Sequence, residues 1–115
     1  MTDKNIILVT GATGYVGGRL VPKLLEAGYR VRCLVRDPSR LQGRAWLNKV
    51  EVVQGDALFS GQISKAMQGV SVAYYLMHGM QGGKINAERD LQVARNFTNA
   101  AEEAGIERII YLGEL

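Results

Sequence analysis

The stretch that most constrains the fold is an apolar run followed at once by three glycines. Residues 6–10 (IILVT) are all aliphatic or β-branched, and Gly11, Gly14 and Gly17 follow at intervals of three. Such a run is typical of a strand buried on both faces, as in a parallel sheet covered by helices. In a strand-to-helix turn, the first glycine allows a sharp change of direction, the second lets a phosphate approach the main chain, and the third allows close helix packing. The pattern predicts a pyrophosphate site at the start of a helix, whose free amides face the phosphates.

The rest of the chain alternates between strand and helix patterns. We expect strands at residues 6–10, 30–35, 50–54, 71–76 and 108–112, and helices at residues 15–27, 38–47, 60–69 and 84–104. Connections this short favour right-handed parallel crossovers. The predicted fold is α/β, a doubly wound parallel sheet of about five strands in the order 3-2-1-4-5, with helices on both faces. The sheet is truncated before a sixth strand, so the fifth is an edge that must be covered or paired. A glycine-rich loop at residues 77–83 is expected to be mobile.

Composition narrows the class of protein. A chain of 115 residues forms one domain, and 47% apolar with 22% charged residues is ordinary for a soluble globular protein. No apolar run approaches the roughly 20 residues of a membrane span, and no secretion signal is recognisable. The single cysteine, Cys33, cannot form an internal disulfide, and one cysteine with one histidine cannot build a zinc site. We therefore expect a cytoplasmic protein with no membrane partner and no metal.

The end of the second strand decides which nicotinamide cofactor is preferred. In this fold, an acidic residue about 20 positions beyond the glycines holds a ribose hydroxyl, whereas an arginine accepts the 2′-phosphate of NADP. That position is Arg36, with Ser39 and Arg40 close behind. Two guanidinium groups and a hydroxyl suit a phosphate, so NADP is favoured over NAD. Asp37 could bind a ribose, but a role as N-cap to Pro38 explains it better.

Other polar residues follow the third and fourth strands. Asp56 lies where an adenine should rest, although a turn-capping role is equally compatible with the sequence. Met77, His78 and Gly79 point toward the nicotinamide end, and His78 fits a loop residue better than a general acid. An arginine cluster at residues 30–44 suggests nucleic acid, but its alternation along a strand argues against such a partner.

Four segments together resemble a known family. They are residues 7–17 (ILVTGATGYVG), 34–38 (LVRDP), 55–56 (GD) and 104–112 (AGIERIIYL). The chain resembles the extended and atypical short-chain dehydrogenase/reductases, particularly the NmrA-like NAD(P)-binding branch, over nearly its whole length. The resemblance implies a Rossmann-like fold and a nicotinamide dinucleotide partner.

The same resemblance assigns site residues. It implies pyrophosphate contacts from the glycine turn, an adenosine phosphate on Arg36, an adenine on the residues after the third strand, and the nicotinamide-side ribose on the residues after the fourth. The residues so assigned are Gly11, Thr13, Gly14, Tyr15, Val16, Gly17, Arg36, Asp56, Ala57, Met77, His78 and Gly79. Asn96 falls where family members often place an asparagine on the fourth helix.

The sequence departs from the family where catalysis would begin. Family enzymes use a Tyr-x-x-x-Lys pair to move a proton, and none of the five tyrosines here has a lysine four residues later. We therefore expect no catalytic residues in residues 1–115, which would be the N-terminal cofactor-binding part of an NAD(P)-dependent oxidoreductase without its substrate part. Two alternatives remain open: a non-catalytic NmrA-like dinucleotide sensor or assembly factor, and a self-associating fragment with an empty site, forming a homo-oligomer through the fifth-strand edge.

Overall fold

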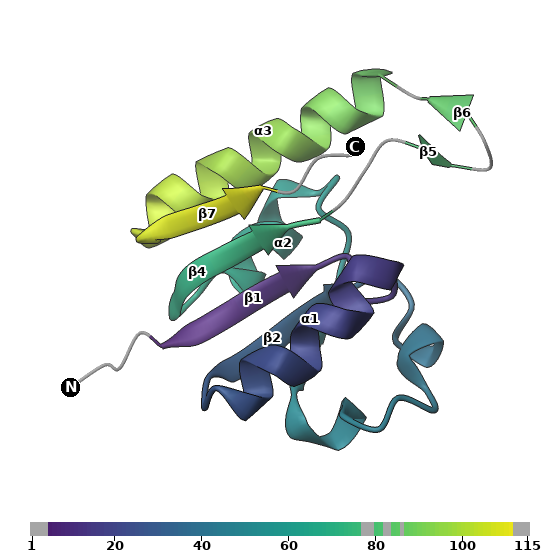
Figure 1. Cartoon of the computed structure of the whole chain (residues 1–115). Coiled ribbons are helices and arrows are strands. Elements are labelled where there is room, and N and C mark those ends of the chain that lie inside the picture. Colours follow the sequence, from purple (N-terminus) through teal and green to yellow (C-terminus); the bar gives the residue numbers. More distant parts are fainter. Residues whose placement is uncertain (1–4, 77–79, 82–83, 86, 112–115) are drawn as a thin grey trace.

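A computed structural model describes residues 5–76, 80–81, 84–85 and 87–111, without the side chains of 80, 81, 84 and 85 (Figure 1). Twelve elements follow one another in this part of the chain. They are β1 (Ile6–Thr10), α1 (Tyr15–Glu26), β2 (Arg30–Val35), the 3₁₀ helices η1 (Pro38–Leu41) and η2 (Leu47–Lys49), β3 (Glu51–Gln54), α2 (Ser60–Ala66), β4 (Val70–Tyr75), β5 (Met80–Gln81), β6 (Lys84–Ile85), α3 (Ala87–Ala104) and β7 (Arg108–Tyr111).

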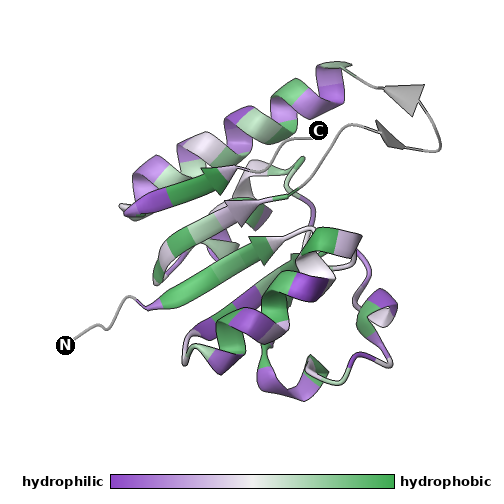
Figure 2. Cartoon of the chain, viewed as in Figure 1, coloured by the Kyte–Doolittle hydropathy of each residue, from purple (hydrophilic) through white to green (hydrophobic). Residues whose placement is uncertain are grey.

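Five strands form one parallel sheet in the order β3-β2-β1-β4-β7. This confirms the predicted fold and strand order. The central strand, β1, is buried at all five positions, as its unbroken apolar run predicts, and it is apolar along its length in Figure 2. The chain leaves β1 toward β2 and β3 on one side and returns to β4 and β7 on the other. The order therefore reverses between β1 and β4, and the carboxyl ends of all five strands lie at one edge of the sheet.

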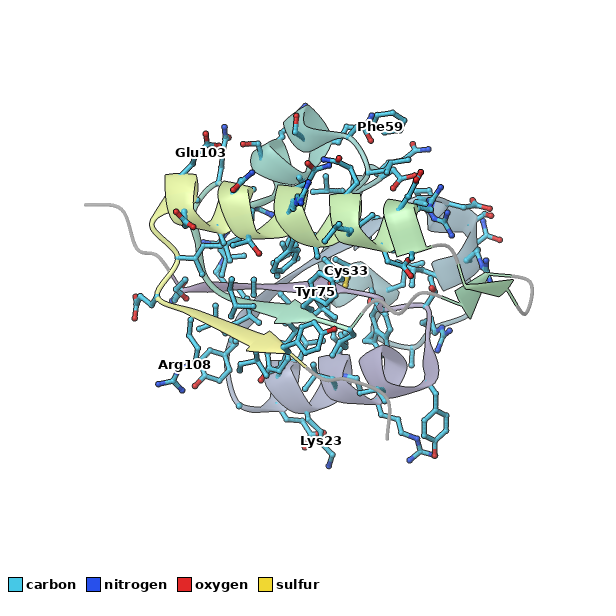
Figure 3. All side chains as sticks on the ribbon, turned by 90° about the horizontal axis from the view of Figure 1, so that it is seen from above. Lys23, Cys33, Phe59, Tyr75, Glu103 and Arg108 are labelled. Carbon is cyan, nitrogen blue, oxygen red and sulfur yellow. The ribbon has the colours of Figure 1, made fainter. Side chains whose placement is uncertain are left out.

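Helices cover both faces of the sheet. Figure 3, a view from above, shows α1 on one side and α2 with α3 on the other. Alternate residues of β1 supply the two cores: Ile7 and Val9 pack in the cluster that includes Val21 of α1, whereas Leu8 packs in the cluster that includes Phe97 of α3. This alternation is the two-residue period of a strand, expressed in a strand that is covered on both faces.

One arginine ties β2 to β3 and α2. The Nη1 atom of Arg32 donates to the carbonyl oxygens of Ala66 and Gln68 at 2.7 and 2.6 Å, and Nε pairs with the Glu51 carboxylate at 2.9 Å. The last carbonyls of a helix lack partners within the helix, and a cation there also complements the helix dipole. Arg32 therefore caps α2 while its own strand holds β3 in register.

The connection between β2 and β3 differs from the predicted helix at residues 38–47. It contains two short 3₁₀ helices, η1 and η2, separated by turns. Gly43 between them has a φ of +85°, which is incompatible with continuing a right-handed helix. Leu41 and Trp46, on either side of Gly43, are both buried in the α1-side core. Tertiary burial therefore holds this segment in place of a regular helix.

The apolar residues at helical spacing in the predicted helix 84–104 are Ala87, Leu91, Ala94, Phe97 and Ala101, and the buried face of α3 agrees with them at Phe97 and Ala101. Its buried residues are Val93, Asn96, Phe97, Ala100 and Ala101. Leu91, which the expected apolar spacing included, is 53% exposed. The helix also starts at Ala87, later than predicted, because residues 84–85 pair antiparallel with residues 80–81. The rest of the predicted mobile loop, at 77–79 and 82–83, lies outside the described residues.

The described residues were compared with two of the sequence expectations, the lack of a membrane span and an edge strand at the end of the sheet. None of its helices has the length and apolar character needed to cross a membrane. In the same described part, β7 pairs with β4 alone, so its other edge is open. Two apolar residues of β7, Ile109 and Tyr111, are exposed.

Candidate cofactor site

The glycine turn joins β1 to α1 at the point where the strand order reverses. Gly11 has a φ of +84°, a conformation that side chains with a Cβ rarely adopt. The Gly14 amide donates to the Gly11 carbonyl at 3.0 Å and closes the turn. A Cβ at Gly17 would overlap the same carbonyl oxygen and lie 2.8 Å from the Ala12 Cα. The first turn of α1 thus packs directly against the backbone of the glycine turn.

Gly14 stands in a different environment. Its backbone is extended, with φ −83° and ψ 177°, and a Cβ there would meet only the Gly11 oxygen, at 3.3 Å. The fold therefore requires a glycine at Gly11 and Gly17 much more strictly than at Gly14. Gly14 is the N-cap of α1 and offers no side chain to bond the first helix amides. Tyr15 and Val16, which follow it, are exposed. The surface at the start of α1 is consequently main chain open to solvent, where amides and the helix dipole favour an anion.

The Thr10 side chain links the carboxyl ends of β1 and β4 by hydrogen bonds. Its Oγ1 donates to the Tyr74 carbonyl at 2.7 Å and accepts from the Leu76 amide at 3.5 Å, although the residue is fully buried. A Cβ on Gly11 would also lie 3.1 Å from the Leu76 side chain. The carboxyl ends of β1 and β4 are thus held together beside the glycine turn.

The residues predicted to read a 2′-phosphate lie just past β2. Arg36, Ser39 and Arg40 are all exposed. Asp37 accepts hydrogen bonds from the Ser39 amide at 3.1 Å and the Ser39 hydroxyl at 2.7 Å, which makes it the N-cap of η1. These bonds from Ser39, with a smaller contribution from the Arg40 charge, lower the pKa of Asp37. The preferred role of Asp37 as a cap is therefore confirmed, and the Ser39 hydroxyl is engaged with it.

A hollow of about 700 Å³ connects the ends of β2 and β3. Its lining residues are Arg36, Val52, Val53, Gln54, Gly55, Asp56, Gln62 and Lys65. Two residues predicted separately from the sequence, Arg36 and Asp56, thus line one hollow. Lys65 and Gln62, on α2, were not predicted, because nothing in their spacing connects them to the strand ends.

Asp56 organises the loop that follows β3. Its Oδ1 accepts from the Leu58 amide at 2.9 Å, and its Oδ2 pairs with Arg89 of α3 at 3.3 Å. Its own amide donates to Oε1 of Gln62. The structure therefore shows the turn-capping role that the sequence left open, while an adenine contact remains a prediction.

Asn96, on α3, is hydrogen-bonded to the same loop. This residue of α3 is buried, and its Nδ2 donates to the carbonyl oxygens of Ala57 and Leu58 at 2.9 and 2.8 Å. Gln92 donates to its Oδ1 at 2.8 Å. The family resemblance singled out Asn96 but not these partners. In this chain Asn96 holds the loop in which Asp56 and Ala57 lie.

Other predicted or reactive residues do not extend the site. Met77, His78 and Gly79 lie outside the described residues. Burial raises the pKa of Cys33 to about 12, so its thiol stays protonated and inert at neutral pH. No group of three or more potential metal ligands occurs among the residues described.

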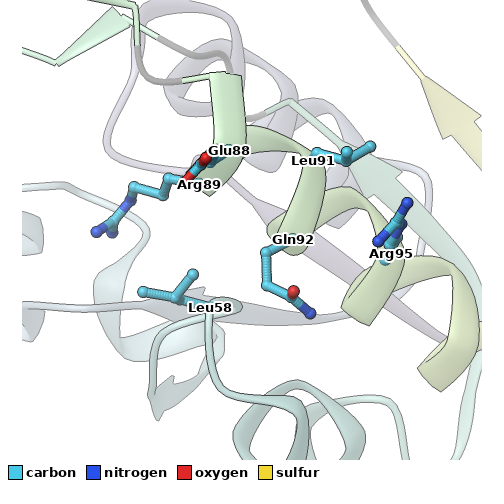
Figure 4. A pocket seen from close by; sticks show the side chains of 6 residues that line it. All are labelled: Leu58, Glu88, Arg89, Leu91, Gln92 and Arg95. Carbon is cyan, nitrogen blue, oxygen red and sulfur yellow. The ribbon is translucent and has the colours of Figure 1, made fainter.

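A second hollow, of about 580 Å³, lies on the outer surface of α3 and was not predicted. Figure 4 shows its lining, which consists of Leu58, Glu88, Arg89, Leu91, Gln92 and Arg95. Three of its lining residues connect it to the loop after β3: Arg89 pairs with Asp56, the Leu58 amide donates to Asp56, and Gln92 donates to Asn96.

The fold and this edge define a class of protein. A doubly wound sheet with a glycine turn at its switch point is a dinucleotide-binding domain. Residues 11–115 match the family described as NAD(P)H-binding, and the chain belongs to that family. The relationship to the short-chain dehydrogenase/reductases expected from the sequence is thereby confirmed.

Individual relatives agree with this assignment. The chain is 32% identical to a 3-beta-hydroxysteroid dehydrogenase of Mycolicibacterium neoaurum over 96% of its own length and 32% of that protein. It is similar to the triphenylmethane reductase of Citrobacter sp. solved with NADP(H), with a TM-score of 0.74, 30% identity, and coverage of 93% and 36% of the two chains. It is also similar to a short-chain dehydrogenase/reductase superfamily protein of Agrobacterium tumefaciens solved with NAD, with a TM-score of 0.72, 31% identity, and coverage of 92% and 31%. The chain spans about a third of the length of the relatives it matches.

The support that Asn96 gives to the loop after β3 can be tested by substitution. Asn96→Leu should lower the free energy of unfolding by about 1–3 kcal/mol, because it leaves buried carbonyls without donors. Asn99→Leu is the matched control, since Asn99 lies on the exposed face of the same helix, and should change stability by about 0.5 kcal/mol or less. Urea unfolding measures both. Equal effects of the two substitutions would show that the Asn96 bonds do not stabilise the loop.

Proposed function

We propose that this chain binds a nicotinamide dinucleotide across the carboxyl edge of its sheet, as the cofactor-binding part of a short-chain-type oxidoreductase, and that it prefers NADP. The observation that carries the proposal is Gly14. Its neighbours leave almost all of the space around it open, and it caps the exposed first turn of α1. A pyrophosphate is the group that needs such an approach to main-chain amides.

The residues present fit this cofactor at both ends. At the pyrophosphate end, Gly11, Gly14 and Gly17 would form the cradle, and Thr13, Tyr15 and Val16 would contribute main-chain contacts. At the adenosine end, the hollow between β2 and β3 contains Arg36 and Asp56. In our proposal Asp56 with Ala57 borders the adenine, and Met77, His78 and Gly79 border the nicotinamide-side ribose. When bound, the cofactor would supply a hydride donor or acceptor.

The preference for NADP rests on charge. Arg36 is exposed and lines the hollow, Arg40 is exposed four residues further along the chain, and Asp37, the acid next to Arg36 in sequence, caps η1. The Asp37 carboxylate is thus engaged in a local capping role, while guanidinium groups remain for a phosphate. The NADP(H) in the Citrobacter reductase supports this choice. The Agrobacterium relative was solved with NAD, so we assign the preference for NADP to these side chains and not to the fold.

Within the 115 residues we propose cofactor binding without turnover. No Tyr-x-x-x-Lys pair occurs in this sequence, so this segment lacks that means of moving a proton during hydride transfer. A non-catalytic dinucleotide sensor would bind in the same way. An enzyme and a sensor differ only in whether a proton donor from elsewhere in the whole protein meets the nicotinamide.

A further proposal concerns the open edge of β7. The unpaired backbone of an edge strand can pair with another chain, and the exposed Ile109 and Tyr111 would add apolar contact area. We propose that copies of this chain associate through β7.

We also propose a location in the cytoplasm. The buried, protonated thiol of Cys33 is compatible with that reducing compartment.

Two glycine substitutions separate binding from folding. Gly14→Val should abolish binding of both NADPH and NADH, because the side chain would occupy the pyrophosphate approach, while the thermal unfolding curve should change little. Gly17→Ala should instead destabilise the fold, because its Cβ would overlap backbone atoms. Fluorescence titration measures binding, and far-UV circular dichroism measures unfolding. Undiminished cofactor affinity in Gly14→Val would refute the cradle.

Selectivity depends on Arg36. Arg36→Ala should weaken NADPH binding by about 1.5–3 kcal/mol, the scale of a lost charged hydrogen bond, and should barely affect NADH. Arg30→Ala is a control at the opposite, amino end of the same strand. Fluorescence titration with both cofactors gives the ratio of their affinities. Equal losses for NADPH and NADH would rule out recognition of the 2′-phosphate.

Association through β7 predicts dimers or larger species at micromolar concentration. Sedimentation velocity should detect them, and Ile109→Lys should shift the population toward monomer, because a charge on an edge strand opposes pairing. A monomer at every concentration tested would contradict association through this edge.

A further inference from the structure

One side chain from the β2–β3 connection reaches the glycine turn. Nη2 of Arg44 donates to the carbonyl oxygen of Thr13 at 3.3 Å, although the two residues are 31 positions apart. Arg44 is half-buried. Thr13 directly precedes Gly14, the residue proposed to lie against the pyrophosphate. The bond therefore acts on the part of the turn whose main chain must be held still for an anion to bind.

The backbone that carries Arg44 is itself fixed. Gly43, immediately before it, takes a φ of +85°, and the Arg44 amide donates to the Leu41 carbonyl at 3.2 Å. Leu41 and Trp46, on either side, are buried in the core cluster that also contains Ala12 of the glycine turn. The guanidinium group is thus presented to the turn from a rigid support.

A glycine in α1, Gly18, leaves space for the Arg44 side chain. A Cβ at Gly18 would lie 2.8 Å from Nη1 of Arg44. Gly18 has an ordinary helical backbone, since its φ is not among the positive values of this chain. Glycine is normally unfavourable inside a helix, so the space it leaves for the guanidinium is a physical reason for its presence. Gly18 is not one of the three glycines of the predicted pyrophosphate turn.

The charge of Arg44 is not neutralised by an acid in the described part of the chain. No carboxylate among the described residues forms an ion pair with it, and its bond to Thr13 is to a neutral carbonyl. A positive charge is therefore held beside the exposed start of α1. Both the charge and the bond favour an anion at this turn.

We propose that Arg44 is a positioning residue of the cofactor site: through the room left by Gly18, it clamps the glycine turn in the conformation that receives the pyrophosphate. The inference rests on the proposed function. The inference also extends the proposed function, because Arg44 connects the segment that carries Ser39 and Arg40 to the turn that would hold the phosphates. Arg44 acts on a part common to both cofactors, so it contributes affinity, whereas Arg36 contributes selectivity.

The experiment measures NADPH and NADH affinity for Arg44→Ala and Gly18→Ala by fluorescence titration. Arg44→Ala should weaken both cofactors by the same factor, roughly tenfold, the scale of one lost charge-assisted hydrogen bond. Gly18→Ala should have a similar effect, because its methyl group displaces the guanidinium. It should cost little stability, because the displaced group is the flexible end of a side chain. In the double variant the two effects should not add, because they break one contact.

Two controls separate this role from general effects of charge or of alanine. Gly61→Ala also replaces a helical glycine, but a Cβ there meets nothing within 4 Å. Arg30→Ala removes an equal charge at the amino end of β2. Neither should change the affinity for either cofactor. Arg44→Lys should restore part of the affinity, because a lysine keeps the charge and a donor but not the planar guanidinium.

The outcomes are distinguishable. If the unmodified chain binds NADPH but Arg44→Ala binds both cofactors as tightly, the clamp is wrong and the cofactor site stands. If Arg44→Ala weakens NADPH alone, Arg44 reads the 2′-phosphate and the positioning role is overturned. Additive losses in the double variant would show that Gly18 and Arg44 do not share one contact. If the unmodified chain binds neither cofactor, the proposed function fails and the clamp fails with it.

Discussion

The structure depends on the contact between the first turn of α1 and the backbone of the glycine turn. Only a residue without a Cβ fits at Gly17, because any side chain would enter the space of the Gly11 carbonyl. This contact sets how closely α1 packs on β1 and directs the start of the helix past Gly14 into solvent. Without this close approach, α1 could not pack its buried residues Val21 and Leu24 against β1 and also leave Gly14 exposed at its start.

Much of the fold could be predicted from sequence because its central elements are specified locally. β1 is aliphatic from Ile6 to Val9 and ends in Thr10, whose hydroxyl is hydrogen-bonded, as a strand buried on both faces requires. The predicted helix at residues 38–47 failed for the opposite reason: its conformation is set by the burial of Leu41 and Trp46 and by Gly43, none of which a helical period reveals. On α3, apolar spacing marked the buried Phe97 and Ala101 but also the exposed Leu91, and it could not mark Asn96, which is buried although polar.

The candidate site likewise contains residues that could be predicted from the sequence and residues that could not. Topology brings the carboxyl ends of parallel strands to one edge, so the sequence alone predicted Arg36 and Asp56 separately as residues at that edge, and the structure shows that they line one hollow. The residues that hold the site in shape could not be found in this way. Asn96 reaches Ala57 across 39 positions, and Arg44 reaches Thr13 across 31. Such bonds depend on where side chains from separate elements meet, and no spacing within one element encodes them.

These supports suggest why affinity and selectivity can vary separately in such a domain. In our proposal the pyrophosphate end is main chain held by Gly11, Gly17 and the Arg44 bond, so substitutions there should weaken both cofactors and, at Gly17, the fold as well. The adenosine end carries the exposed side chains of Arg36 and Arg40, which are not part of either buried core. Exchanging those residues leaves the core and the glycine turn intact. On this proposal a single backbone framework can serve either cofactor, with the choice made by exposed side chains that lie outside both buried cores.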